Sequence, residues 1–121
     1  MLKTILIVDD ETVVVDISKR RLMQKGYAVL CAHNGEEALE VLRNGKVDLI
    51  VLDVEMPGMN GYTFMSERKN IPDAADVPVL VVTAYPNMEP IFQRQGIKMY
   101  LLKPLQFSEF TAKIKEIIGE P

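Results

Sequence analysis

The stretch Asp48-Leu49-Ile50-Val51-Leu52 is followed directly by Asp53, so a run of large apolar side chains ends at a carboxylate. The hydrophobicity of this run is continuous and does not alternate, which is typical of a parallel strand covered on both faces. Other short apolar runs, rich in β-branched residues, repeat the pattern along the chain. They are Thr4 to Val8, Tyr27 to Cys31, Val79 to Val82 and Ile97 to Leu102. We therefore expect five parallel strands.

Segments of helical period separate these runs. The first has an apolar face and is followed by Gly26, a typical C-terminal cap. That face is made of Val14, Ile17, Ser18 and Leu22. Asn34 is a good N-cap for the second segment, which Gly45 ends. Further helices are expected at 62–69, at about 87–95 and along an apolar stripe. The stripe consists of Phe107, Phe110, Ile114, Ile117 and Ile118.

Strict alternation of strands and helices predicts an α/β fold. Parallel strands need right-handed crossovers, which put helices on both faces of the sheet. We expect a five-stranded parallel sheet doubly wound by five helices, in the flavodoxin-like order 2-1-3-4-5. The length of 121 residues predicts a single domain over residues 1–121. In such sheets ligands bind at the carboxyl ends of the strands.

The composition narrows the class of protein. Hydrophobic residues make up 48% and charged residues 26%, as in ordinary globular proteins. The formal net charge is −3 without a basic run, so direct nucleic-acid binding is not expected. The apolar N-terminal run meets Asp9 too early for a signal peptide or membrane span. The single cysteine, Cys31, reads as a buried thiol in a reducing compartment. We expect a cytoplasmic location without membrane contact.

Three aspartates follow strands that we expect to be neighbours. Asp9 and Asp10 close the first run, and Asp53 closes the third. Two carboxylates about 4 Å apart repel by roughly 4 kcal/mol at an effective dielectric constant of about 20, so a shared site needs a cation. Each acid alone is better explained as a helix N-cap or a strand-end residue, but the three together are not. Oxygen ligands without a His/Cys set favour Mg²⁺ over Zn²⁺.

Two more strand ends carry suitable groups. Thr83 closes the fourth run with a hydroxyl, and Lys103 closes the fifth with a compact cation. Either residue alone is explained as a cap or an exposed charge. The order of acids, threonine and lysine at successive strand ends indicates a site that holds a phosphoryl oxygen.

Four motifs, in this order, resemble those of the response regulator receiver domain of two-component signalling, in chemotaxis-regulator-like form. The resemblance covers essentially the whole chain. The acidic pair lies in Ile7-Val8-Asp9-Asp10-Glu11, and the phosphorylation loop is Asp53-Val54-Glu55-Met56-Pro57-Gly58-Met59-Asn60-Gly61. The switch motif is Val82-Thr83-Ala84, and Lys103-Pro104 resembles the family's lysine with a following cis-prolyl bond.

The resemblance implies a phosphoprotein in phosphorelay signal transduction. Asp53 would accept a phosphoryl group from a sensor histidine kinase or a histidine phosphotransfer protein. Asp10 and Asp53 would bind Mg²⁺, Asp9 would orient a water on the metal, and the Glu55 backbone carbonyl would complete the protein ligands. The chain would not be an enzyme with a separate substrate. It would catalyse only its own phosphotransfer and a slow dephosphorylation.

The resemblance also assigns a switch. Thr83 and Lys103 would bind the phosphoryl oxygens, Thr83 would move toward the phosphate, and Tyr100 would rotate inward. The implied output surface comprises the fourth helix, the fifth strand and the fifth helix, for a downstream protein or an effector domain missing from this chain. Only 20 positions separate Thr83 from Lys103, and Pro86 and Pro90 lie between them. Proline fits only a first helical turn, so the fourth helix should be brief, displaced or disordered at its start.

Three other functions share part of the pattern. A flavin-binding flavodoxin needs a small-residue phosphate loop after the first strand, where this chain has Asp9, Asp10 and Glu11. A phosphohydrolase with an aspartate nucleophile usually has a second Asp two residues on, where this chain has Glu55. A pseudo-receiver that works without phosphorylation is disfavoured by the intact phosphorylation-type residues.

Overall fold

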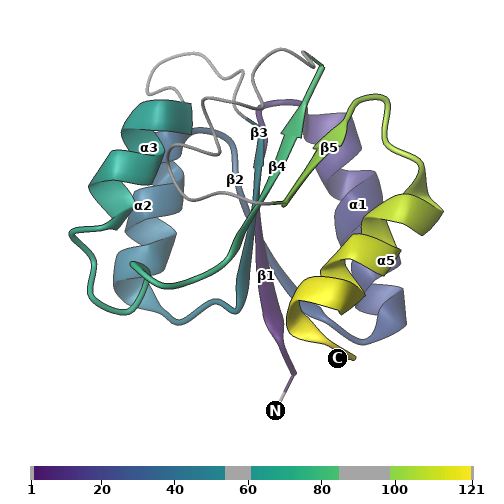
Figure 1. Ribbon diagram of the computed structural model, residues 1–121, viewed down its shortest axis with the longest axis horizontal. Coiled ribbons are helices and arrows are strands. Elements are labelled where there is room, and N and C mark those ends of the chain that lie inside the picture. Colours follow the sequence, from purple (N-terminus) through teal and green to yellow (C-terminus); the bar gives the residue numbers. More distant parts are fainter. Residues whose placement is uncertain (1, 54–60, 85–98, 121) are drawn as a thin grey trace.

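The computed structural model describes residues 2–53, 61–84 and 99–120, which contain a five-stranded parallel sheet in the order β2-β1-β3-β4-β5 (Figure 1). The strands are β1 (Thr4–Val8), β2 (Ala28–Ala32), β3 (Leu49–Asp53), β4 (Val79–Thr83) and β5 (Met99–Leu102). Every neighbouring pair is parallel. The predicted fold class and strand order are confirmed.

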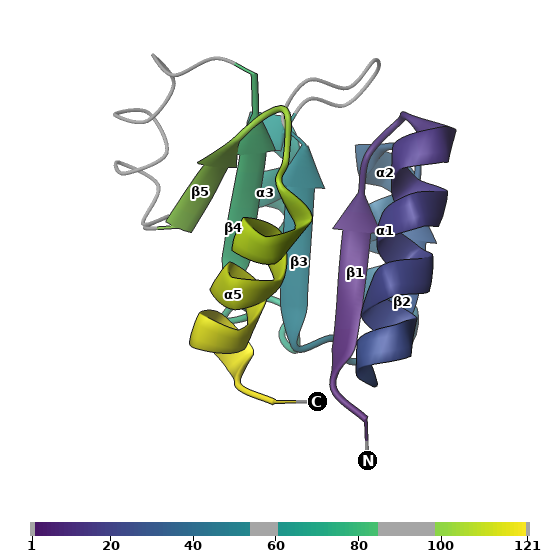
Figure 2. The same cartoon turned by 90° about the vertical axis from the view of Figure 1, so that its right-hand side faces the viewer.

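Helices cover both faces of the sheet, as a doubly wound fold requires. Helices α2 and α3 lie on one face, and α1 and α5 lie on the other (Figures 1 and 2). Their bounds are α1 (Thr12–Lys25), α2 (Gly35–Asn44), α3 (Gly61–Arg68) and α5 (Phe107–Ile118). The helix expected at about 87–95, with the prolines before it, lies outside the described residues. Within the part that is described, no helix has the length and apolarity needed to cross a membrane.

The sheet divides the core into two layers because successive side chains of a strand point to opposite faces. In β3, Ile50 and Leu52 pack in the layer under α2 and α3, together with Phe64 and Met65. Leu49 and Val51 pack in the other layer, which also contains the buried residues of α1 and α5. All residues of β3 and β4 are buried. Covering on both faces explains why their hydrophobicity is continuous.

The buried face of α1 differs from the predicted one. Val15 and Leu22 are 1% and 0% exposed, whereas Val14 and Ile17 are 36% and 52% exposed. Val15 and Leu22 are seven residues apart, or about two helical turns, so they point together at the sheet. Val14, Ile17 and Ser18 instead border a groove that faces α5. The prediction grouped the groove residues with the core residue Leu22 and missed Val15.

The predicted helix ends are confirmed by their capping geometry. Gly26 has φ 108°, in the left-handed region where a side chain is disfavoured. Its backbone N–H donates to carbonyl oxygens in the last turn of α1. The Asn34 side chain accepts a hydrogen bond of 2.8 Å from the Glu37 backbone N–H at the start of α2. Gly45 follows α2 with an extended backbone.

Arg68 fixes the chain between α3 and β4. It is 8% exposed, and its Nη1 donates to the carbonyl oxygens of Ala74, Ala75 and Val77 at 2.7, 3.0 and 3.2 Å. Burial lowers the pKa of this guanidinium, which the charge of Asp76 partly offsets. A single cation therefore satisfies backbone acceptors that belong to no regular ladder, and it sets how the chain enters β4.

The orientation of α1 is tested by a pair of truncations. Leu22→Ala should lower the free energy of unfolding by about 2–5 kcal/mol, because a fully buried side chain leaves a cavity. Ile17→Ala, on the exposed groove side, should change it by less than about 0.5 kcal/mol. Urea denaturation followed by circular dichroism gives both values. If both variants lose the same free energy of unfolding, Ile17 belongs to the buried face of α1, as predicted from the sequence.

Candidate functional site

The carboxyl ends of β1 and β3 bring the predicted acids together. Val8 pairs with Leu52 in the parallel register, so Asp9 follows β1 at the level where Asp53 ends β3. The backbone N–H of Asp9 donates to the Ala32 carbonyl at 3.0 Å, which ties the start of the loop to β2. Asp53 belongs to the strand itself and pairs with Val82 of β4. The sheet, rather than a flexible loop, holds both carboxylates.

Asp9, Asp10 and Asp53 form a cluster whose carboxylate oxygens lie within 4.8 Å of one another. Asp53 and Asp9 are 3% and 6% exposed, whereas Asp10 is exposed to solvent. Acidic oxygen donors this close, with one side open to water, fit a hard divalent cation such as Mg²⁺. The fourth predicted ligand, the Glu55 carbonyl, lies outside the described residues.

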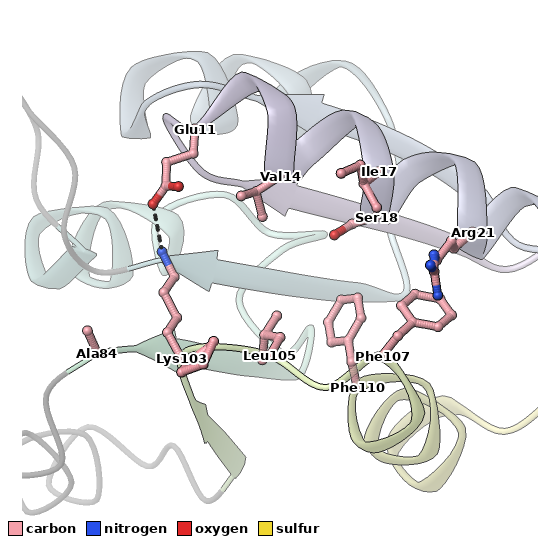
Figure 3. A pocket seen from close by; sticks show the side chains of 11 residues that line it. Glu11, Val14, Ile17, Ser18, Arg21, Ala84, Lys103, Leu105, Phe107 and Phe110 are labelled. Atoms are coloured by element: carbon pink, nitrogen blue, oxygen red, sulfur yellow. Dashed lines mark hydrogen bonds and ion pairs between the residues drawn. The ribbon is translucent and has the colours of Figure 1, made fainter.

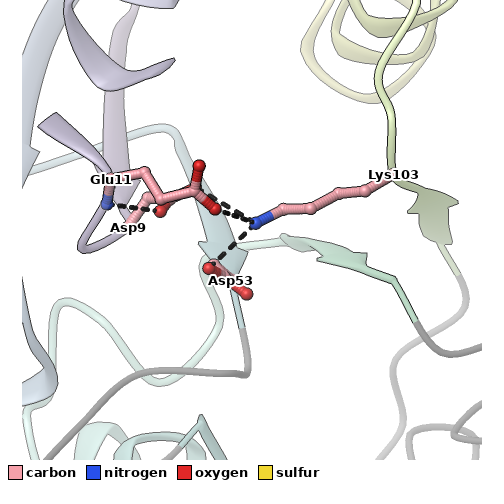
Figure 4. Close-up of polar contacts among 4 residues, drawn as sticks. All are labelled: Asp9, Glu11, Asp53 and Lys103. Atoms are coloured by element: carbon pink, nitrogen blue, oxygen red, sulfur yellow. Dashed lines mark hydrogen bonds and ion pairs between the residues drawn. The ribbon is translucent and has the colours of Figure 1, made fainter. Parts of the chain in front are cut away.

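Lys103 supplies the positive charge of the site. It follows β5, and its Nζ lies 3.0 Å from Asp53 Oδ2, 3.4 Å from Glu11 Oε1 and 3.7 Å from Asp9 Oδ2 (Figure 4). Its backbone N–H donates to the Thr83 carbonyl at 2.8 Å. The Lys103–Pro104 peptide bond is cis, as the family resemblance implied.

The carboxylates stabilise the charged form of Lys103. Burial disfavours the ammonium, but the hydrogen bond to Asp53 and the charges of Asp53, Asp9 and Glu11 outweigh burial and raise the pKa of Lys103. A pKa that is raised on folding contributes stability that is fully present below the unfolded value of about 10.4. This contribution is lost as the pH rises through the folded value.

The two predicted switch residues lie on adjacent strands. Thr83 is the last residue of β4, is 2% exposed, and pairs with Leu102. Tyr100 pairs with Val81 and is half-buried against the core layer of α2 and α3. The structure thus places Thr83 beside the segment that carries Lys103. Tyr100 lies deeper in β5, and its switching role stays a prediction.

Glu11 is a site residue that the sequence did not single out. Its carboxylate pairs with Lys103, although it is not a member of the cluster that could hold a metal. The Glu11 backbone N–H donates to Asp9 Oδ1 at 2.9 Å, which fixes the loop between β1 and α1. Its position directly after the acidic pair is the feature of the sequence that could have indicated this role.

A groove of about 750 Å³ runs from the site between α1 and α5 (Figure 3). Glu11 and Lys103 stand at one end. At the other end the Arg21 guanidinium lies over the Phe107 ring, 4.8 Å from its centroid. The apolar lining includes Val14, Ile17, Leu105, Phe107 and Phe110. The site therefore opens onto an apolar groove that is bounded by α1 and α5.

The fold and the site together define an α/β protein with a carboxylate and lysine centre at the edge of a parallel sheet. The family model of the response regulator receiver domain matches residues 5–115. The chain belongs to this family, whose members act in two-component signalling.

Known proteins agree with this assignment. The chain is 37% identical over 119 residues to a probable transcriptional regulator, ycf27, of Cyanidium caldarium, covering 94% of this chain but 45% of that protein. The chain thus spans less than half of that relative's length. The structure of chemotaxis protein CheY4 of Vibrio cholerae has a TM-score of 0.90 at 25% identity, covering 97% of this chain and 99% of that one. Response regulator TrrA of Thermotoga maritima, solved in complex with Mg²⁺ and BeF, has a TM-score of 0.84 at 34% identity, covering 96% and 99%.

Removing the positive charge of Lys103 tests whether this residue stabilises the cluster of carboxylates. Lys103→Met should lower the free energy of unfolding at pH 7 in metal-free buffer by about 1–3 kcal/mol, because the buried carboxylates lose their charged partner. Added Mg²⁺ should restore part of the loss. Lys113→Met, which breaks the exposed pair with Glu116 on α5, is the control and should cost no more than about 1 kcal/mol. Equal small effects in both variants would show that the cluster does not depend on Lys103.

Proposed function

We propose that the chain is a phosphoacceptor in a two-component system, with Asp53 as the nucleophile. The observation that carries this proposal is the Lys103 ammonium 3.0 Å from the buried Asp53 carboxylate, beside the further acids Asp9 and Asp10. A carboxylate held on a rigid strand end, with a cation aimed at it, suits in-line attack on a phosphoryl group. The donor is a sensor histidine kinase or a histidine phosphotransfer protein.

The transfer balances as a single displacement. An oxygen of Asp53 forms a bond to phosphorus while the bond from phosphorus to the donor's imidazole nitrogen breaks, and the nitrogen keeps that electron pair. In the transition state, negative charge is carried by the oxygens of the phosphoryl group that is being transferred. Lys103 and the Thr83 hydroxyl would bind two of these oxygens, which is the main help that phosphoryl transfer needs from a protein. Hydrolysis of the aspartyl phosphate by water completes a slow cycle.

The acids around Asp53 would hold Mg²⁺. Asp10 and Asp53 would be direct ligands together with the Glu55 carbonyl, and Asp9 would orient a water of the ion. A bound Mg²⁺ would neutralise the charge of the acids and of the entering phosphoryl group. Asp9 is suited to the outer position because its Oδ1 already accepts the Glu11 backbone N–H.

The output of the switch would come from the β4 and β5 side of the sheet. Thr83 would move toward the phosphate, and the half-buried Tyr100 would turn inward as the space beside β4 changes. The output surface would include β5 and α5 and would contact a downstream protein or an effector domain. Because the relative in Cyanidium caldarium is longer and is called a transcriptional regulator, we propose a transcriptional output. A cytoplasmic location stays a prediction from the sequence.

The groove between α1 and α5 is the surface that we assign to the phosphodonor. It begins at Glu11 and Lys103, and its exposed apolar lining includes Val14 and Ile17. A helix that carries the donor histidine could lie on this lining and present its imidazole to Asp53. Small phosphodonors need no such surface.

The first test is covalent labelling. Incubation with phosphoramidate and Mg²⁺ should add one phosphoryl group by intact-mass spectrometry, and Asp53→Asn should abolish it. Chelation of Mg²⁺ should prevent labelling, because the acids then oppose the entering group. Asp10→Asn should weaken Mg²⁺ binding more than Asp9→Asn, since a direct ligand is lost. Stoichiometric labelling of Asp53→Asn would remove Asp53 from this role.

The second test separates the donor surface from the chemistry. Ile17→Glu places a charge on the apolar groove, so phosphotransfer from a phosphorylated histidine phosphotransfer domain should slow by about tenfold or more, as expected for loss of a buried interface contact. Labelling by phosphoramidate should be unchanged. Val13→Glu, at an exposed position outside the groove lining, is the matched control. If Ile17→Glu slows both donors equally, the groove is not the docking surface.

A further inference from the structure

Glu11 differs from the other carboxylates that contact Lys103. Asp53 and Asp9 have side-chain exposures of 3% and 9%, whereas Glu11 is 58% exposed and extends from the first residue before α1. Its 3.4 Å contact with Lys103 is also the longer of the two that qualify as hydrogen bonds, since Asp53 lies at 3.0 Å. Of the three carboxylates around Lys103, Glu11 is therefore the one most exposed to solvent (Figures 3 and 4).

The charge balance of the site shows what Glu11 adds. Asp9, Asp10 and Asp53 bring three negative charges, and Lys103 with one divalent cation would bring one plus two, which is three positive charges. The site is then neutral without Glu11. The Glu11 carboxylate is one negative charge in excess, on the exposed side of the site, and it accepts a hydrogen bond from Lys103 at 3.4 Å.

Of the three carboxylates on Lys103, Glu11 is the one that can leave. Asp53 is fixed in β3, and Asp9 is held by the hydrogen bond from the Glu11 backbone N–H. The Glu11 side chain has a longer, flexible stem and no other hydrogen-bond donor among the described residues. Its withdrawal into water costs only an exposed ion pair, which is weak. Its charge still acts on an approaching anion at short range.

We infer that Glu11 is a specificity-determining residue that selects the phosphodonor by charge. It disfavours acyl phosphates, whose phosphoryl group is a full dianion at neutral pH. Phosphoryl groups on nitrogen are less disfavoured, because protonation of the nitrogen reduces the net negative charge. The inference rests on the proposed phosphoacceptor function. Its consequence is that free acyl phosphates compete poorly with a protein donor for Asp53.

The experiment compares two small donors in the presence of Mg²⁺, acetyl phosphate and phosphoramidate. Glu11→Gln should accelerate labelling by acetyl phosphate about two- to fivefold, the range expected for one exposed charge pair, and should change labelling by phosphoramidate less. Raising the ionic strength should reduce the difference between wild type and Glu11→Gln, since exposed charges are screened.

Glu116→Gln is the matched control, because Glu116 is also 58% exposed and also pairs with a lysine, Lys113 at 3.3 Å, near the end of α5. It should leave both rates and their ratio unchanged. In metal-free protein, the Lys103 side-chain NMR resonances should shift in Glu11→Gln and not in Glu116→Gln. This second readout does not depend on phosphorylation.

The outcomes separate the inference from the function on which it rests. If the wild type is not labelled by either donor, the phosphoacceptor proposal fails. If it is labelled but Glu11→Gln leaves the ratio of the two rates unchanged, the charge-selection role of Glu11 is wrong. Equal slowing of both donors would likewise overturn it, because Glu11 would then be a positioning residue that helps to orient Lys103.

Discussion

The repulsion among carboxylates at the end of the sheet is the constraint on which the site depends. Asp9, Asp10 and Asp53 lie within 4.8 Å of one another, and two of them are buried. At this separation each pair opposes folding by a few kcal/mol at an effective dielectric constant of about 20. Lys103 offsets this cost in the described structure through its contact with Asp53. The same crowding of negative charge is the physical reason why this cluster could hold a divalent cation.

The sheet explains how such a site can be rigid. Each functional side chain follows or ends a strand that is hydrogen-bonded to its neighbours, and β3 and β4 are buried along their whole length. Arg68 extends this control to the segment that precedes β4, by donating to three carbonyl oxygens, and so it fixes the strand that ends at Thr83. The strands hold Asp9 and Asp53 in place, while the flexible stems of Lys103 and Glu11 provide the adaptable contacts.

Most of the fold could be predicted from the sequence because the apolar runs are continuous and the helix caps are strong. The strand ends then placed Asp9, Asp53, Thr83 and Lys103 without further information. Two features could not be predicted in this way. Periodicity alone did not separate the core residue Val15 from the groove residues Val14 and Ile17, because each of these apolar positions fits some helical face. The contact of Glu11 with Lys103 joins residues 92 positions apart, and it follows from the loop geometry after β1, which no local pattern encodes.

The separation of these contacts along the chain has a consequence for measurement. Lys103 meets Asp53 across 50 positions of sequence, so the pair exists only when β3, β4 and β5 have assembled. Phosphorylation of Asp53, if it needs Lys103, therefore takes place only in folded molecules. Because unfolded molecules refold and are then labelled, a core substitution far from the site would lower the observed rate of labelling in proportion to the folded population and leave the rate per folded molecule unchanged. The observed rate divided by the folded fraction, which circular dichroism measures separately, would then distinguish damage to the scaffold from damage to the site.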